Sequence, residues 1–340
     1  MKRFGMCLGL GLILLLTATD GSAQDYEKLA QSGMEFLNVK SDAEAAAMAG
    51  AVTTLEMGSR SLFFNPAGMA RLGGKHWLNG DVSFSANRWI ADIEHGTFSA
   101  AVSPARGRYG VVGISLQYVD YGDLQWTMAD LTQDKGYRDI DEDFSPYALA
   151  AGLGYALAIT DRFSVGGQVH WIRQQLGQNY VPDGAADIDT VKNEVSPFSF
   201  DFGTIFKTGF KSLAFGMSIR NFSKEYKFEH GKEEFQLPLI FAMGIGMDVL
   251  DLLPSKGIDQ SLWISVDAVH HRSRPEQVLV GLNYTILQML SVRVGYAGAE
   301  DENDFSFGIG AGFKYAYFDY AYTPFGIFDS VQRVTMRASF

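Results

Sequence analysis

The sequence of 340 residues contains a single cysteine, Cys7, so no disulfide bond can form within one chain. It also has only one long apolar run, Leu8–Leu16, which is shorter than the ~20 residues of a membrane-spanning helix. Two positive charges precede this run and small residues follow it, whereas a lipoprotein signal would need its cysteine after the run. The pattern predicts a cleaved secretory signal peptide over residues 1–23.

Basic residues are in deficit, because 28 Lys and Arg face 39 Asp and Glu, which gives a formal net charge of −11. Binding to nucleic acid depends on neutralising phosphates, so no nucleic-acid partner is expected. Long helical periods are also missing after about residue 75. A secreted chain of this length without disulfides needs another source of cohesion, and a large closed sheet would supply it.

From about residue 75 onward, apolar and polar residues alternate in short runs between turn residues, which predicts an all-β protein. In residues 109–119, Ile114 and Leu116 share one face while Ser115 and Gln117 share the other. Such faces suit a transmembrane barrel with a polar lumen, and they also suit a soluble sandwich. The candidate strands lie near residues 75–85, 88–103, 108–119, 146–158, 161–176, 197–207, 211–222, 236–249, 260–270, 276–285, 289–298, 304–313, 315–322 and 331–340.

The lengths of the connections favour the barrel. Long connections at 120–145, 177–196 and 223–235 alternate with tight ones, such as those at Thr160–Asp161 and Gln288. Outer-membrane barrels show this asymmetry, with short periplasmic turns and longer extracellular loops. We therefore predict a transmembrane antiparallel barrel of about fourteen strands over residues 75–340, with both termini in the periplasm of a Gram-negative-type bacterium. One connection, 250–259, is longer than the rule allows and indicates either a short periplasmic helix or a misplaced strand boundary.

Residues 24–74 differ from the rest of the chain and form a predicted plug. The stretch "SDAEAAAMAGAV" has helical composition and a Ser41–Glu44 capping pattern. As a disordered arm, this segment would leave apolar side chains such as Phe36, Leu37 and Leu62 without cover. We expect it to fold into the mouth of the barrel.

The stretch "FFNPAG" near the end of this segment predicts a tight turn. Pro66 fixes its own φ and lacks an N–H, Asn65 can close a side-chain turn, and Gly68 permits a reversal. Such a turn would lead the plug back to the wall. The predicted plug motif consists of Phe63, Phe64, Asn65, Pro66, Ala67 and Gly68.

The last strand alternates strictly and ends in Phe340. A terminal strand ending in phenylalanine resembles the closing strand of bacterial outer-membrane barrels, which the insertion machinery is thought to recognise. We therefore assign Phe340 as a predicted assembly signal.

The search for catalytic or metal sites gives weak candidates. His270 and His271 are adjacent on a strand and point to opposite faces, so they do not make a metal pair. The acidic stretch 138–144 offers oxygen ligands for calcium, together with Asp120, Asp123, Asp130 and Asp134, but lacks the glycine and terminal glutamate of an EF-hand. His170 could pair with a serine in the lumen, without any supporting signature. We expect neither enzymatic chemistry, nor a metal, nor a cofactor.

Charged residues on predicted inward faces could line a polar pore. We expect them instead to neutralise one another in a polar network across a closed lumen, because unpaired charge at membrane depth is costly. Its predicted members are Arg162, His170, Arg220, Asp267, Arg293, Asp319, Arg333 and Arg337.

Two stretches carry a family resemblance. Phe36–Leu72 resembles the N-terminal signature of the PorV/PorQ family, within the larger superfamily of the fatty-acid transporter FadL, and "DYAYTPFG" at Asp319–Gly326 resembles the family's C-terminal end. The resemblance implies a fourteen-stranded barrel with an N-terminal plug. The chain departs from the family pattern in two places: acidic Asp42 and Glu44 stand in a stretch that has a basic residue in the family, and Met57–Arg60 replaces an acidic stretch.

The resemblance also implies function. It points to a non-enzymatic component of type IX protein secretion, which would bind cargo carrying a C-terminal signal domain or a large translocon barrel through loops 120–145 and 177–196. The superfamily implies an alternative, passage of hydrophobic small molecules, with a ligand pocket near Phe63, Phe64 and Met69. Outer-membrane lipid would surround the barrel in either case. A soluble periplasmic sandwich is a third possibility.

Overall fold

The structure is a computed structural model, and it describes residues 32–73, 76–129, 132–182, 188–227, 234–253, 257, 259–298, 304–328 and 330–340. The predicted signal peptide and Asp130, one of the candidate calcium ligands, lie outside these residues.

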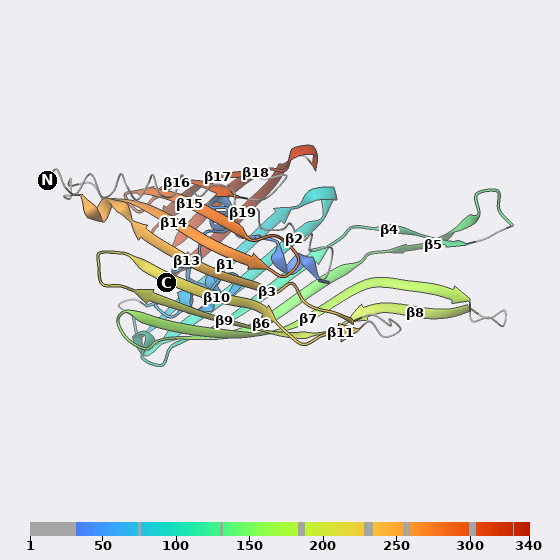
Figure 1. Cartoon of the computed structure of the whole chain (residues 1–340), viewed down its shortest axis with the longest axis horizontal. Helices are drawn as coiled ribbons and strands as arrows, with labels where there is room; N and C mark the ends of the chain where they lie inside the picture. The colour runs from blue at the N-terminus through green and yellow to red at the C-terminus, as the bar shows by residue number, and fades with distance from the viewer. Residues whose placement is uncertain are drawn as a thin grey trace.

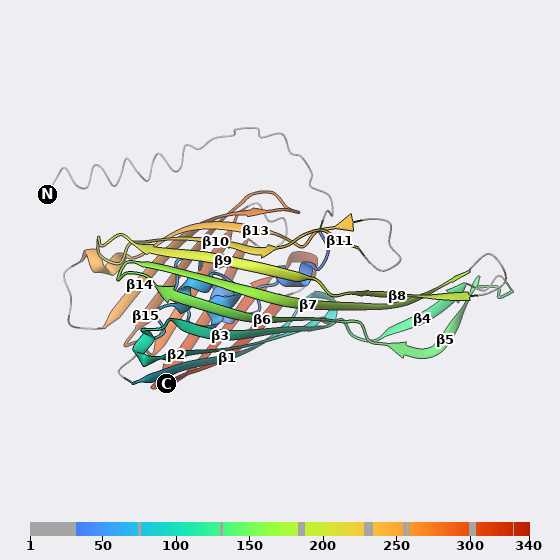
Figure 2. The ribbon, with the colours of Figure 1, turned by 90° about the horizontal axis from the view of Figure 1, so that it is seen from below.

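Fifteen strands form one antiparallel sheet, and the pairing of β6 with β7 closes it into a barrel (Figures 1 and 2). Strand β8 pairs only with the far end of β7 and lies outside the ring, which leaves fourteen wall strands. The wall strands are β1 (Leu78–Arg88), β2 (Glu94–Pro104), β3 (Val111–Asp120), β6 (Tyr147–Ala158), β7 (Phe163–Pro182), β9 (Phe198–Lys207), β10 (Ala214–Phe222), β13 (Ile240–Asp248), β14 (Gln260–His271), β15 (Gln277–Ile286), β16 (Leu290–Ala297), β17 (Phe305–Phe313), β18 (Ala316–Pro324) and β19 (Ser330–Ser339). The predicted barrel and its strand number are confirmed.

The wall has its polar face inside and its apolar face outside. On β3, Ser115 and Gln117 are buried, whereas Ile114 is 49% and Leu116 is 39% exposed. A soluble sandwich would place these faces the other way round, with the apolar side chains in the core. The inverted arrangement is that of a barrel surrounded by lipid, so the alternation found in the sequence marks a membrane wall.

The two ends of the barrel differ in their connections. At the short-turn end, tight turns join β6 to β7, β9 to β10, β15 to β16 and β17 to β18, and a 3₁₀-helix, η6 (Val249–Leu252), lies in the longer connection before β14. At the long-loop end, β4 (Leu124–Ala129) and β5 (Tyr137–Phe144) form a hairpin, and β7 continues past the wall to pair with β8 (Ile188–Val195). Both extensions project away from the barrel (Figures 1 and 2).

The long connections therefore contain ordered strands where we expected loops. The acidic stretch 138–144 belongs to β5, which pairs with β4 along one edge. Smaller elements complete this end: η4 (Ile90–Asp92), β11 (Tyr226–Lys227), β12 (Glu234–Phe235) and η7 (Gly326–Phe328). Within the described part of the chain, no helix is long and apolar enough to cross a membrane.

The N-terminal segment lies inside the lumen, where it extends beyond the mouth of the barrel at which the sequence predicted a plug. It contains η1 (Glu35–Asn38), α2 (Ala43–Ala47), η2 (Gly58–Phe63) and η3 (Pro66–Met69), seen as blue turns inside the ring in Figure 2. Helix α2 contacts β16 to β19, and η2 and η3 contact strands on the opposite side, including β3, β6 and β7. The plug thus bridges two halves of the wall.

The plug also runs the length of the barrel. Its first described residue, Ser32, forms an isolated bridge with Gln236 at the long-loop end. The last residue of the whole chain, Phe340, follows β19 and pairs with Gly80 at the short-turn end. The described part of the chain thus begins and ends at opposite ends of the barrel. The sequence predicted both termini on the periplasmic side, and the N-terminus itself lies outside the described residues.

Candidate functional site: the plug and its contacts with the wall

The plug motif is a tight turn held by the Asn65 side chain. Its Oδ1 accepts a hydrogen bond from the N–H of Ala67 at 3.1 Å, which caps η3, and Pro66 occupies the first turn, where its missing N–H costs nothing. The Nδ2 group of Asn65 donates to the carbonyl oxygens of Thr53 at 2.7 Å and Thr204 at 3.2 Å. One side chain therefore joins two parts of the plug to strand β9.

The wall facing the motif consists of glycine. A methyl group added to Gly166 on β7 would lie 2.5 Å from the carbonyl carbon of Pro66, and one added to Gly203 on β9 would collide with Asn65. Within the plug, a methyl group on Gly68 would lie 2.6 Å from the carbonyl oxygen of Leu55. Gly166 and Gly68 allow backbone to approach backbone, whereas Gly203 leaves room for the Asn65 side chain.

Helix α2 packs against the opposite wall through small residues. Ala47 lies over Gly308 and Ala49 over Gly295, so a methyl group at either glycine would collide with the plug. The helix is capped by Asp42, whose Oδ1 accepts a hydrogen bond from the N–H of Ala45 at 2.9 Å. The sequence predicted a cap at Ser41; the cap lies one residue later, where Asp42 can also reach a buried cation.

That cation is Arg60, which is 2% exposed and joins two parts of the plug. It pairs with Asp42 at 3.1 Å and with Glu44 at 2.8 Å. Glu44 also pairs with Arg293 of β16 at 3.4 Å, and Arg293 pairs with Asp319 of β18 at 2.6 Å. Two predicted network residues, Arg293 and Asp319, thus pair with each other, but the other three of the five charges in this chain come from the plug.

The neighbouring guanidinium groups in this chain of charges change the pKa of Glu44. Burial alone would raise the pKa of its carboxyl group, but the guanidinium groups of Arg293, Arg60 and Arg337 outweigh burial and lower the pKa to about 2. Glu44 therefore stays ionised at neutral pH, as its two ion pairs require.

Three more of the predicted wall residues hold the plug. Arg333 donates to the carbonyl oxygen of Lys40 at 2.7 Å, and Asp267 accepts from the N–H of Thr53 at 2.9 Å. Arg220 donates to the carbonyl oxygen of Phe63, and its guanidinium lies 5.8 Å from the centre of the Phe64 ring. These side chains therefore bind the plug instead of one another.

Arg337 reaches the plug through a wall carboxylate. It pairs with Asp81 of β1 at 2.8 Å, and Asp81 accepts hydrogen bonds from the N–H and Oγ of Ser59 at 2.8 and 2.6 Å. Nothing in the sequence assigned a contact to Asp81, Ser59 or Arg60. Arg60 could have been noticed, because it is the only charged residue between Met57 and Ala70.

Two predicted lumen residues behave differently. Arg162 was predicted to face the lumen, but β7 begins one residue later, at Phe163. Arg162 therefore lies in the turn before β7, where it is exposed. His170 does face the lumen, where Ser199 Oγ and Asp201 Oδ2 both approach its Nδ1, at 3.5 and 3.6 Å. A catalytic triad needs its serine and carboxylate on opposite ring nitrogens, so this arrangement is not a triad.

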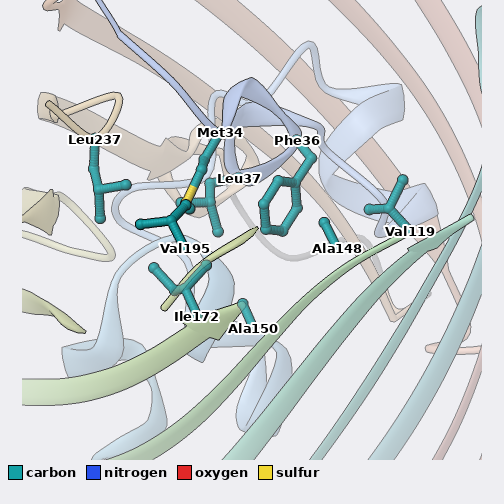
Figure 3. Packing of buried hydrophobic residues seen from close by; sticks show 9 residues of the cluster. All are labelled: Met34, Phe36, Leu37, Val119, Ala148, Ala150, Ile172, Val195 and Leu237. Atoms are coloured by element: carbon teal, nitrogen blue, oxygen red, sulfur yellow. The ribbon is translucent and has the colours of Figure 1, made fainter. Parts of the chain in front are cut away.

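An apolar cluster covers the plug at the long-loop end (Figure 3). Met34, Phe36 and Leu37 pack there against residues of the wall and its extensions, and Gln117 Nε2 donates to the carbonyl oxygen of Phe36 at 2.8 Å. The other residues of this cluster are Val119, Ala148, Ala150 and Ile172 of the wall, Val195 of β8 and Leu237 in the connection before β13. The apolar side chains predicted to need cover thus receive it from the barrel.

The described residues line three cavities between plug and wall, and Arg220 contributes to the lining of each. Their volumes are about 20, 30 and 20 Å³. Since about 10–15 Å³ holds one water molecule, each has room for one or two. Phe63 and Phe64 line some of them, as predicted for a pocket, whereas Met69 is fully buried and packs with Leu62 near Gly113 of β3.

The remaining candidate ligands are dispersed. His270 is exposed beside Glu276 at 2.9 Å, whereas His271 is buried and lines one of the cavities. Among the residues that the structure describes, no group of three or more His, Cys, Asp or Glu side chains could hold a metal ion.

Solved structures with the same fold include two toluene transporters. The Ralstonia pickettii transporter TbuX aligns with a TM-score of 0.54 and 12% identity over 87% of this chain and 96% of its own. The Pseudomonas putida transporter TodX aligns with a TM-score of 0.54 and 11% identity over 92% of this chain and 98% of its own. At these identities the likeness establishes the fold alone. The comparison with curated proteins gave no match.

The sequence profile of one protein family matches this chain over residues 22–264, from before the plug to the middle of β14. The family is described as type IX secretion system protein PorV. The match covers most of the chain, including the plug motif, the Arg60 ion pairs and both extended hairpins. This outer-membrane barrel belongs to the PorV family.

Proposed function

We propose that this chain is a non-enzymatic component of type IX protein secretion that binds secreted cargo or a translocon partner at the cell surface. The observation that carries the proposal is the family match over residues 22–264. The proposed orientation places the short-turn end in the periplasm and the long-loop end outside, as in other outer-membrane barrels. A cleaved signal peptide over residues 1–23 would direct export.

The filled lumen supports a binding role over a conducting one. The plug is held by buried ion pairs on one side, and on the other by the close approach of the Pro66 backbone to Gly166 and of the Asn65 side chain to Gly203. An apolar ligand the size of benzene occupies a cavity of roughly 150 Å³. The three cavities between plug and wall are several-fold smaller, so passage of hydrophobic molecules would first require the plug to move.

The extended hairpins supply the proposed contact surface. The β4–β5 hairpin and the β7–β8 extension stand clear of the barrel and present strand edges together with exposed acidic side chains such as Asp123 and Asp139 (Figure 1). Because strand edges and charged side chains are available without opening the barrel, a partner could bind here while the lumen stays closed.

The first experiment is extraction of the tagged protein from its own membranes in mild detergent, with bound proteins and lipids identified by mass spectrometry. We expect secreted proteins that share a C-terminal domain, or a very large barrel. A stoichiometric apolar ligand without protein partners would overturn the proposal in favour of transport.

A variant without the β4–β5 hairpin tests whether this hairpin is the surface that binds the partners. Residues 123–144 are replaced by a short Gly-Ser linker, which removes β4 and β5 but leaves β3 and β6 paired. We expect the partners to be lost while heat-modifiable migration, the sign of a folded barrel, is kept. Retention of all partners by the folded variant would contradict the assignment of this hairpin.

A further inference from the structure

Four exposed cations lie together at the short-turn end of the barrel. Arg106 and Arg108 are in the turn between β2 and β3, Arg162 is in the turn between β6 and β7, and Lys211 is in the turn between β9 and β10. These turns are neighbours, because β3 pairs with β6 and β7 pairs with β9. We call this set the basic rim.

The rim cations are not used in ion pairs. In the same sector, Arg71 and Lys207 both pair with Glu56, at 3.1 and 2.8 Å. By contrast, the described residues place no carboxylate within 4.0 Å of any rim cation, although Asp161 lies next to Arg162 in the sequence. The barrel therefore leaves a local excess of positive charge on a chain whose net charge is −11.

The local backbone does not explain these side chains. Arg106 has a φ of 59° and Lys211 a φ of 53°, in the left-handed region that Gly, Asn and Asp adopt at lower cost. Lys314, in the turn between β17 and β18 at the same end, has a φ of 55°. A cation stands at each of these positions although the turn itself would be more stable with glycine, asparagine or aspartate.

Exposed aromatic side chains place the rim at the membrane surface. Trp77 is 69%, Tyr109 65% and Phe210 58% exposed, and they lie in or beside the turns that carry the rim. Arg108 lies 5.9 Å from the centre of the Tyr109 ring. Such rings mark the depth of lipid headgroups in barrels, so the cations next to them reach the phosphate layer.

We infer that the basic rim binds the phosphate groups of anionic phospholipids in the leaflet that faces the short-turn end. Arg and Lys are the side chains that recognise phosphate, and several of them act together on a charged membrane surface. In the proposed orientation this leaflet is the periplasmic one. The inference depends on that orientation but not on the role in secretion, because it concerns the opposite end of the barrel from the hairpins.

The test measures which lipids the full chain retains. The protein is purified in mixed micelles containing equal amounts of phosphatidylglycerol and phosphatidylcholine, and the bound lipids are counted by native mass spectrometry. We expect a preference for phosphatidylglycerol that falls by about fivefold for each rim cation removed, and that is lost at about 1 M salt.

The rim variant is Arg106→Gln, Arg108→Gln, Arg162→Gln and Lys211→Gln. The matched control removes four exposed cations from the long-loop end: Lys135→Gln, Arg138→Gln, Lys192→Gln and Lys224→Gln. Heat-modifiable migration checks folding, and Lys211→Gln alone serves if the fourfold variant does not fold. An equal loss in the control, a preference unchanged in the rim variant, or recovery of an acidic protein in place of lipid would each overturn the inference.

Discussion

Arg60 reaches Asp42 and Glu44 across a fold of the plug. These residues belong to the two stretches in which the chain departs from the pattern of the family that it resembles. In the structure the acidic residues of one stretch lie against the basic residue of the other and pair with it. The sequence could not show this, since nothing in it places residue 60 beside residue 42.

We expect Arg60→Met to destabilise the folded protein by about 3–5 kcal/mol, because it leaves Asp42 without its buried partner. The midpoint of urea unfolding in detergent, followed by tryptophan fluorescence, measures the effect. Arg88→Met is the matched control, since Arg88 pairs with Asp92 in full exposure and should change the midpoint little. Equal midpoints for the two variants would show that the plug does not depend on Arg60.

The lowered pKa of Glu44 predicts how stability depends on acidity. A carboxyl group whose folded pKa of about 2 lies below its ordinary value of 4.5 stabilises the fold above pH 4.5, and this contribution is lost as the pH falls toward 2. We expect the urea midpoint to decline over this window, and to decline less in Glu44→Gln. Parallel declines in both proteins would assign the acid sensitivity to other groups.

At the scale of elements, the plug fits the wall because small residues occupy both surfaces. Period-two alternation located every wall strand to within six residues, since each strand must alternate independently of its neighbours. It could not locate β4, β5 and β8, because both faces of those strands are outside the membrane and their pattern is not constrained by lipid. The sequence also could not show which glycines face the plug, since glycine occurs in turns and bulges as well.

Two adjacent glycines on β7, Gly166 and Gly167, allow a test of the close contact between the plug and the wall. A methyl group at Gly166 would press on the backbone of Pro66, so we expect Gly166→Ala to destabilise the protein by about 1–3 kcal/mol. Gly167 faces the other side of the strand, where the nearest atom to such a group is the Asp201 carbonyl oxygen at 3.5 Å, and Gly167→Ala should be nearly neutral. Urea midpoints compare the two. A smaller loss at Gly166 than at Gly167 would contradict the close contact.

For the whole molecule, closure of the barrel brings together the first and last wall strands, which are about 250 residues apart in sequence. Phe340 donates to and accepts from Gly80 across this seam, at 2.8 and 2.7 Å, and its ring lies over the glycine. The sequence predicted a role for Phe340 in recognition by the insertion machinery. The structure adds a second role, in closing the barrel.

The two roles predict different results for Phe340→Ala and for deletion of Phe340. Phe340→Ala keeps both backbone hydrogen bonds and removes only the ring, so the purified protein should still refold in detergent and show heat-modifiable migration. If the ring is also the assembly signal, membrane levels in cells should fall for both variants. Deletion additionally removes the two hydrogen bonds, at about 1 kcal/mol each, and should lower stability in the purified protein as well. Normal membrane levels of Phe340→Ala would reject the recognition role and leave seam closure as the function of this residue.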